Sequence, residues 1–342
     1  MSGAWTVIAA VLSFAIAGLM GIRLVPFLRK LHFGQTIREE GPKWHKGKQG
    51  TPTMGGFMFI AASIAATVIC VLLYHHMGEK DGIPAESTLQ SAKIYGGLFM
   101  AAAFGAIGFL DDYVKVAKKR NLGLTPVQKL ALQFLAAIAY LVTMYFFGET
   151  TSTYIPFIGS VDIGIMYYPI AAVLIVGIVN AVNLTDGIDG LNGSVTMFAA
   201  IFMMLISSFT ARMGLSIMSA ALAGGCLGFL LWNFHPAKTF MGDTGSLFLG
   251  GYVCAVLFGL DREILLIPIG FVYIAEMFSV ILQVTYFKLT KGKRLFKMSP
   301  IHHHFEMCGW SEVKIVVVFS LIEALCGAAA LAMVIFDGGA AF

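Results

Sequence analysis

Long apolar segments recur along almost the whole chain, and they constrain its fold more than any other feature. Hydrophobic residues make up 58% of the 342 residues, whereas charged residues make up 12%, about half the share in a soluble domain. About 20 apolar residues suffice for a helix to cross a bilayer. The sequence predicts an all-α polytopic membrane protein, a single domain over 1–342 with about ten transmembrane helices. It excludes a soluble enzyme, a disulfide scaffold and a disordered chain. The runs lie at about 4–22, 54–74, 94–110, 130–147, 167–182, 194–211, 214–232, 246–260, 264–287 and 313–336.

Basic residues are distributed unevenly between alternate loops. Most of the 23 lysines and arginines fall in the loops at 23–53, 111–129, 233–245 and 288–312. Because Lys and Arg collect on the cytoplasmic side of a membrane, we expect these loops to be cytoplasmic and both termini to lie outside. The outer loop at 148–166 alternates apolar and polar residues around a Pro and a Gly, which predicts a small β-hairpin.

Five aspartates lie at the predicted cytoplasmic ends of spans. Asp111 and Asp112 follow the third span, Asp186 and Asp189 follow the fifth, and Asp243 precedes the eighth. Carboxylates at a lipid boundary are costly unless they are paired or bound to a metal. Hard oxygen ligands of this kind suit Mg²⁺ bound together with phosphate oxygens. Helix capping favours Asp too, but it does not explain why five gather in three loops on one side.

The last cytoplasmic loop contains His302, His303 and His304 within PIHHHFE, just downstream of five basic residues. Three consecutive residues cannot all face one ion from a helix or a strand, so the run favours an anion-binding surface over a metal cluster. Imidazoles can donate hydrogen bonds to phosphate oxygens. The alternative is a surface His tract in an ordinary positive-inside loop.

Two weaker signals lie elsewhere. The loop GPKWHKGKQGTPTMGG at 41–56 is basic and rich in glycine, so its amides and Lys43, Lys46 and Lys48 can line a phosphate site, although it is not a Walker P-loop. Gln283 lies near the cytoplasmic end of the ninth span. It either hydrogen-bonds another helix or recognises a nucleobase edge. Pro268 and the length of that span leave room for a kink or break.

Taken together, these motifs resemble the polyprenyl-phosphate N-acetylhexosamine-1-phosphate transferases over nearly the whole chain. The matching pieces are GTPTMGG (50–56), DDYVK (111–115), the turn leading to Lys129, NLTDGIDGL (183–191), NFHPAKTFMGDTGSL (233–247) and PIHHHFE. The HHHFE loop points to the muramoyl-pentapeptide branch of that family.

The resemblance implies an Mg²⁺-dependent enzyme of the bacterial inner membrane with its active site on the cytoplasmic face. It would transfer phospho-MurNAc-pentapeptide from UDP-MurNAc-pentapeptide to undecaprenyl phosphate and yield lipid I and UMP. The expected partners are these two substrates, the lipid bilayer and a second copy of the chain in a homodimer, but no nucleic acid. A transferase that uses UDP-GlcNAc, and an ion-coupled transporter or lipid flippase, are the alternatives.

The resemblance also implies a role for each matching residue. Asp243 would be the direct Mg²⁺ ligand, with Asp111 and Asp112 completing the acidic cluster and acting on the lipid phosphate as base or covalent nucleophile. Of the nucleoside-binding residues, Phe240 would stack on uracil and Asp189 would accept its N–H. The remaining expected contacts are Asn183 and Asn233 to the nucleoside, Lys115, Lys129 and His302 to His304 to phosphates, and Lys48, Thr53, Asp186 and Gln283 within the substrate site.

Overall fold

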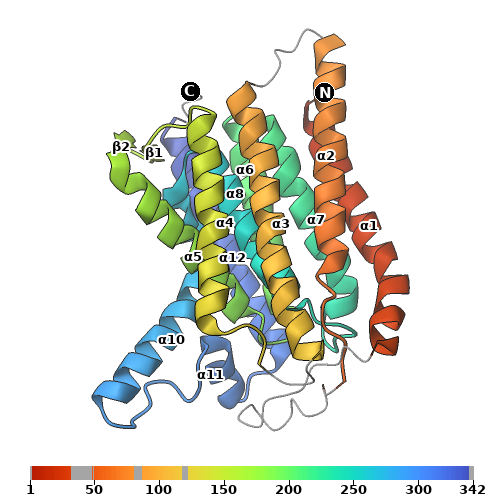
Figure 1. Ribbon diagram of the computed structural model, residues 1–342, viewed down its shortest axis with the longest axis vertical. Coiled ribbons are helices and arrows are strands. Elements are labelled where there is room, and N and C mark those ends of the chain that lie inside the picture. Colours follow the sequence, from red (N-terminus) through yellow and green to blue (C-terminus); the bar gives the residue numbers. More distant parts are fainter. Residues whose placement is uncertain (1, 32–47, 49, 81–86, 118–121, 339–342) are drawn as a thin grey trace.

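A computed structural model describes the chain except for residues 1, 32–47, 49, 81–86, 118–121 and 339–342. The described part is a bundle of helices with one two-stranded sheet (Figure 1). The helices are α1 (Ser2–Lys30), α2 (Phe57–Lys80), α3 (Thr88–Ala117), α4 (Pro126–Phe146), α5 (Tyr167–Thr185), α6 (Leu191–Phe209), α7 (Met213–Asn233), α8 (Gly242–Gly259), α9 (Leu266–Ile269), α10 (Phe271–Leu289), α11 (Ile301–Met307) and α12 (Glu312–Phe336), with short 3₁₀ turns at Gly164–Met166 and Glu263–Leu265.

Nine helices in the described part of the chain are long and apolar enough to cross a membrane. They correspond to nine of the predicted runs. The tenth run, 246–260, forms α8, which is shorter and begins with the polar turn Gly242-Asp243-Thr244. Almost every residue of α8 is buried, because α3 and α5 pack along it and other helices also contact it. The chain is therefore a multi-pass membrane protein whose central helix is α8.

Small residues let α3 and α8 pack closely along their lengths. Gly97 of α3 faces Ala255 of α8, and Gly251 of α8 faces Ala101 of α3. At Gly108, a Cβ atom would lie 2.0 Å from the carbonyl oxygen of Asp243, so only glycine permits this approach. Small residues at such interfaces allow helices in a membrane to come close. The packing brings the end of α3 next to the start of α8.

The hairpin lies at the opposite end of the bundle from α11 (Figure 1). Its strands, β1 (Ser152–Ile155) and β2 (Gly159–Asp162), pair antiparallel, which confirms the prediction. Lys93, near the start of α3, pairs there with Glu149 at 2.7 Å and Asp261 at 2.5 Å. The start of α1 and the end of α12 lie at this same end (Figure 1), as expected for two termini on one side.

The predicted ninth span is broken into α9 and α10. Gly270, two residues after Pro268, separates them and has a non-helical backbone. In Figure 1, α10 leans away from the bundle, and its outer face exposes Phe271, Phe278 and Leu282. The break confirms the prediction and directs α10 toward the end that carries α11.

Candidate active site

Three aspartates from two helices converge at the end of the bundle that carries α11. Asp111 and Asp112 lie in the last turns of α3, and Asp243 lies in the first turn of α8. One carboxylate oxygen from each of the three lies within 4.8 Å of the others. Asp111 and Asp112 are buried, and Asp243 is 18% exposed. The sequence prediction that these residues form one acidic cluster is therefore consistent with their geometry.

Two lysines and an asparagine surround the carboxylate of Asp243. Lys115 Nζ and Lys129 Nζ lie 2.8 Å and 2.9 Å from its Oδ2. Lys115 Nζ also lies 2.6 Å from Asp111 Oδ2. The amide of Asn183 donates to Asp243 Oδ1 at 2.9 Å. Three negative charges thus face two positive charges, and the two lysines and the asparagine come from three different helices, α3, α4 and α5.

Backbone groups fix the orientation of the Asp pair. Asp111 Oδ1 accepts the N–H of Leu124 at 2.8 Å, whereas Asp112 Oδ2 accepts both the N–H and the hydroxyl of Thr244 at 2.9 and 2.8 Å. Asp112 Oδ1 lies 3.6 Å from Lys115 Nζ, beyond hydrogen-bond distance. The two aspartates therefore differ in their hydrogen bonding. Both carboxylate oxygens of Asp111 have a close partner, whereas within the described part of the chain only Oδ2 of Asp112 has one.

Thr53 lies beside the same cluster. A Cβ atom at Gly242, whose φ is +70°, would lie 2.6 Å from Thr53 Oγ1 and 2.5 Å from Asp112 Oδ2. The loop before α2 is held there by hydrogen bonds from Gly55 N to the carbonyl of Phe240 at 2.8 Å and from Phe240 N to the carbonyl of Pro52 at 2.8 Å. Glycine at position 242 thus leaves the space in which Thr53 meets the acidic cluster.

The donor set of the cluster fits a magnesium ion. Mg²⁺ binds oxygen at about 2.1 Å, so two ligands on opposite sides of the ion are about 4 Å apart. Three carboxylate oxygens within 4.8 Å of one another nearly match that span, and the ion usually keeps several waters besides one or two carboxylates. Asp111, Asp112 and Asp243 are therefore able to hold it, in competition with the two ammonium groups.

Asp186 lies between this cluster and a second one. It follows α5 directly as its C-cap. Burial, together with the charges of Asp243, Asp112 and Asp189, raises the pKa of the Asp186 carboxyl to about 8. Aspartates of both clusters contribute to this shift, so Asp186 lies within electrostatic reach of both.

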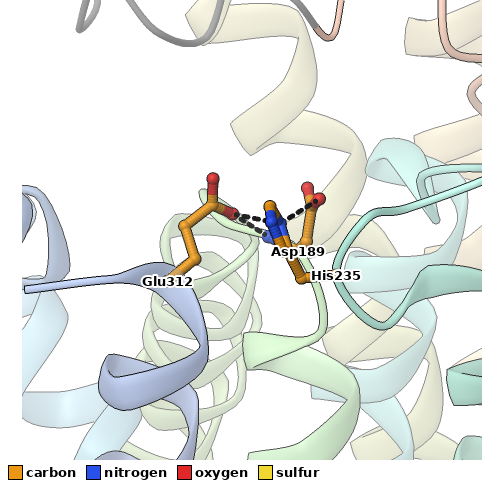
Figure 2. Close-up of side chains that lie close together, drawn as sticks. All are labelled: Asp189, His235 and Glu312. Atoms are coloured by element: carbon orange, nitrogen blue, oxygen red, sulfur yellow. Dashed lines mark hydrogen bonds and ion pairs between the residues drawn. The ribbon is translucent and has the colours of Figure 1, made fainter.

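The second cluster contains Asp189, His235, Glu312 and Lys48. Lys48 Nζ lies 2.7 Å from Asp189 Oδ1 and 2.6 Å from Glu312 Oε2. His235 Nδ1 lies 3.1 Å from Asp189 Oδ2 and 3.9 Å from Glu312 Oε2. Figure 2 shows the imidazole of His235 between the two carboxylates. The predicted residues Lys48 and Asp189 are thus paired with each other, whereas Lys43 and Lys46 lie outside the residues that the structure describes.

Two of the residues expected at the nucleoside differ in their surroundings. Asn233 is buried, accepts the N–H of Gly190 at 3.1 Å and donates to the carbonyl of Thr239 at 2.9 Å. Both ends of its amide therefore join the loop after α5 to the loop before α8. Phe240 is partly buried in that second loop. The structure thus gives Asn233 a bracing role and leaves part of the Phe240 ring accessible.

The three consecutive histidines lie in α11 and have different surroundings. His302 is fully buried; its Nδ1 lies 3.0 Å from Glu276 Oε1 in α10, and its ring lies against Gly187. His303 Nδ1 is 2.5 Å from Glu306. His304 Nδ1 accepts the N–H of Lys297 at 3.2 Å. The helical turn thus directs the three rings to different partners, and His302 is the one beneath the turn that carries Asp186 and Asp189.

Gln283 binds the loop between α10 and α11. Its Oε1 accepts the N–H groups of Leu295 and Phe296 at 3.0 and 2.9 Å, and its Nε2 donates to the carbonyl of Phe296 at 3.1 Å. The expected hydrogen bond of this side chain is therefore made to a loop backbone. It attaches the loop that precedes the histidines to α10.

Sequence reasoning missed three residues of the two clusters. Thr244 follows Asp243 directly, His235 lies in the motif NFHPAKTFMGDTGSL, and Glu312 begins the last span. Glu312 carries the same signal as the five aspartates, an acidic side chain at a span end on the same face. That signal was sufficient to find it.

Comparison with known proteins shows which proteins the chain is similar to. The family model described as Glycosyl transferase family 4 matches residues 94–260. The chain is 45% identical over 331 residues to a protein of Caldicellulosiruptor bescii, covering 96% of this chain and 97% of that protein. It is 47% identical to a Clostridium perfringens protein, covering 93% and 94%, and 47% identical to a Heliobacterium modesticaldum protein, covering 93% and 95%. All three are named phospho-N-acetylmuramoyl-pentapeptide-transferase.

Proposed function

The chain belongs to the family of phospho-N-acetylmuramoyl-pentapeptide-transferases, and we propose that it catalyses the reaction for which they are named. It transfers phospho-MurNAc-pentapeptide from UDP-MurNAc-pentapeptide to undecaprenyl phosphate, forming lipid I and releasing UMP in peptidoglycan synthesis. The observation that carries the proposal is the convergence of Asp111, Asp112 and Asp243 with Lys115 and Lys129 at one end of the bundle. Such a site suits two phosphate-bearing substrates.

The reaction joins two anions, so it requires charge neutralisation and alignment more than a strong base. The phosphate oxygen of undecaprenyl phosphate bonds to the sugar-linked phosphorus of the donor, while the bond from that phosphorus to the UMP oxygen breaks. Lys115 and Lys129 both contact Asp243, and we propose that they neutralise the charge that develops on the phosphate oxygens. An Mg²⁺ ion held by Asp243, with Asp111 and Asp112, would polarise the diphosphate and stabilise the departing UMP.

Asp112 is the better placed of the Asp pair to act on the lipid phosphate. Lys115 and the N–H of Leu124 occupy both oxygens of Asp111. Thr244 holds one oxygen of Asp112 and fixes the direction of the other. We propose that Asp112 Oδ1 accepts the proton of the lipid phosphate as that phosphate attacks. In the alternative, Asp112 Oδ1 bonds to the donor phosphorus as the bond to UMP breaks, and the lipid phosphate then displaces the carboxylate. Asp111 then serves to hold Lys115 and the metal.

The donor nucleotide is assigned to the second cluster and its neighbours. Asp189 keeps acceptor capacity, since a carboxylate has about four acceptor positions and three are used by Lys48, His235 and Ala237. We propose that it accepts the N–H of uracil and that the exposed part of Phe240 stacks on the base. Asn183, which donates to Asp243 at 2.9 Å, would link the nucleoside-binding residues to the aspartates that would hold the metal.

We propose that this end of the bundle lies at the cytoplasmic face of the bacterial inner membrane, where a soluble nucleotide donor is available; the basic loops support this orientation. The chain acts within the lipid bilayer, which supplies undecaprenyl phosphate. We also propose that the chain forms a homodimer; this part of the proposal is based on the family resemblance alone.

An exchange assay tests the proposed reaction. The purified protein is mixed with undecaprenyl phosphate, Mg²⁺ and either UDP-MurNAc-pentapeptide or UDP-GlcNAc, and the release of UMP is measured. We expect UMP and a lipid product from the first donor and neither from the second. Release of UMP from UDP-GlcNAc alone would assign the chain to the other sugar, and no release from either would refute the transferase assignment.

A further inference from the structure

Glu312, the first residue of α12, reaches across the second cluster to two groups that belong to other elements. Its Oε2 lies 2.6 Å from Lys48 Nζ and accepts the backbone N–H of Asp189 at 3.0 Å. The side chain is 9% exposed. Figure 2 shows its carboxylate directed toward Asp189 and His235. One oxygen thus joins the loop before α2, the turn after α5 and the start of α12.

Helix capping does not account for this residue. An acidic side chain in the first turn of a helix is favoured by the helix dipole, but Ser311 already caps α12 by accepting the N–H of Lys314 at 3.3 Å. The carboxylate of Glu312 instead binds partners 264 and 123 positions away in sequence. Its contacts are therefore long-range and converge on the proposed donor site.

The charges of the cluster show what Glu312 adds. Lys48 lies on both carboxylates, so it remains bound to Asp189 when Glu312 is neutral. The N–H of Asp189, however, has a buried partner in Glu312, and an unsatisfied buried donor is costly. Glu312 therefore holds the backbone of Asp189 directly. It also shares the ammonium group of Lys48 with Asp189, so the Asp189 carboxylate keeps the capacity to accept a hydrogen bond from a ligand.

We propose that Glu312 is a positioning residue for the donor nucleotide. It acts through Asp189 and Lys48 and does not itself touch the substrate. It fixes the direction of the Asp189 carboxylate and keeps Lys48 from neutralising that carboxylate completely, so that Asp189 presents an oriented acceptor to the uracil. This inference rests on the proposed function, because it assigns the nucleoside end of that donor to the second cluster.

Two substitutions separate the two contacts of Glu312. In Glu312→Gln, the amide oxygen can still accept the N–H of Asp189, whereas the charge that attracts Lys48 is lost. In Glu312→Ala, both contacts are lost. Loss of a hydrogen bond that involves a charged group corresponds to roughly a tenfold change in a dissociation constant. We expect the Kd of UMP to rise about tenfold in Glu312→Gln and further in Glu312→Ala.

The measurement is titration calorimetry of the purified protein with UMP and, separately, steady-state kinetics with both substrates. The KM for UDP-MurNAc-pentapeptide should rise with the Kd of UMP, and the KM for undecaprenyl phosphate should stay unchanged. Glu149→Gln is the matched control, because Glu149 forms a comparable ion pair with Lys93 at 2.7 Å at the other end of the bundle. This control should bind UMP as the wild type does.

A double-mutant cycle tests the route through Lys48. If Glu312 acts through that ammonium, the effects of Glu312→Gln and Lys48→Gln on UMP binding are not additive. Unchanged UMP binding in both Glu312 variants overturns the inference. A rise in the KM of both substrates that parallels a fall in thermal stability overturns it too, because it indicates a general structural defect. Failure of the wild type to bind UMP would instead refute the proposed function, so the two failures are distinguishable.

Discussion

Lys115 in α3 and Asp243 in α8 form an ion pair with Nζ and Oδ2 2.8 Å apart. The pair joins the last turn of α3 to the first turn of α8 beside the acidic cluster. Lys115 Nζ also binds Asp111 at 2.6 Å, so one ammonium group joins a metal-ligand candidate in each helix. The close packing of α3 against α8 therefore determines which charged groups meet in the acidic cluster.

Gly108→Ala should displace α3 from α8. The new Cβ would lie 2.0 Å from the carbonyl oxygen of Asp243, and this backbone atom cannot move without moving the first turn of α8. Overpacking of this kind typically costs about 1–3 kcal/mol. We expect a lower midpoint of thermal unfolding and a turnover reduced by at least an order of magnitude. Gly177→Ala is the control, because its Cβ would meet no atom within 4 Å; equal stability of the two variants would contradict the prediction.

Lys129→Met should change metal binding and turnover in opposite directions. Lys129 Nζ lies 2.9 Å from Asp243 Oδ2, where it competes with a divalent cation for the same oxygen. Its removal should tighten Mn²⁺ binding several-fold, measured by electron paramagnetic resonance, because Asp243 then faces Lys115 alone. Turnover should fall, because a phosphate contact is lost. A variant with weaker Mn²⁺ binding would show that Lys129 supports the metal site rather than competing with it.

The apolar runs predicted the bundle because each run has the length and composition that a bilayer requires. In lipid the backbone must satisfy its own hydrogen bonds, and a single helix does so within one segment. The break in the ninth span was also predictable, since the run is longer than a bilayer requires and contains Pro268. The alternating loop predicted the hairpin for a similarly local reason. These features depend on residues that are close together in the sequence.

The site was predictable as a set of residues but not as an arrangement. Polar residues at span ends identified Asp111, Asp112 and Asp243, whereas their partners depend on which helices pack together. Nothing local indicates that Gln283 binds a loop backbone. The three histidines looked equivalent in sequence, yet a helical turn buries His302 against Glu276 and directs His304 toward Lys297. Long-range packing decides those roles.

The membrane orientation predicts opposite labelling at the two ends of the bundle. Cys308 is exposed near α11, at the end assigned to the cytoplasm, so an impermeant maleimide applied to intact cells should not label the wild type. Ser160 is exposed in β2, so Ser160→Cys in a Cys308→Ser background should be labelled. Permeabilised cells should label both proteins. Labelling of Cys308 in intact cells would place the acidic cluster on the outer face and refute a cytoplasmic donor site.

Asp186 predicts a pH dependence of stability in the absence of metal. Its pKa is raised to about 8, whereas an Asp in the unfolded chain has a pKa of about 3.9. The native state thus holds the proton more tightly, so the stability that this group contributes below about pH 4 is lost progressively as pH rises toward about 8. Asp186→Asn cannot ionise. In EDTA, its unfolding midpoint should therefore fall less between pH 6 and pH 8.5 than that of the wild type; parallel curves would contradict the shift.

Asp243 provides the decisive test of the metal assignment. Its carboxylate lies at the junction of α3 and α8, with Asp111 and Asp112 close enough to share an ion. Asp243→Asn keeps the size of the side chain and an oxygen that can accept from Lys129, but it removes the charge that binds a cation. We expect Mn²⁺ binding to weaken by at least tenfold and turnover to fall by orders of magnitude, with little recovery at high Mg²⁺.

The control for that test is Asp261→Asn, because Asp261 carries a similar ion pair with Lys93 at 2.5 Å at the other end of the bundle. It should bind Mn²⁺ as the wild type does, even if its stability falls. If Asp243→Asn binds Mn²⁺ with unchanged affinity, the metal belongs to Asp111 and Asp112. The fall in turnover would then reflect the loss of the Asp243 anchor for Lys115 and Lys129, and Lys129→Met would no longer be expected to tighten the metal.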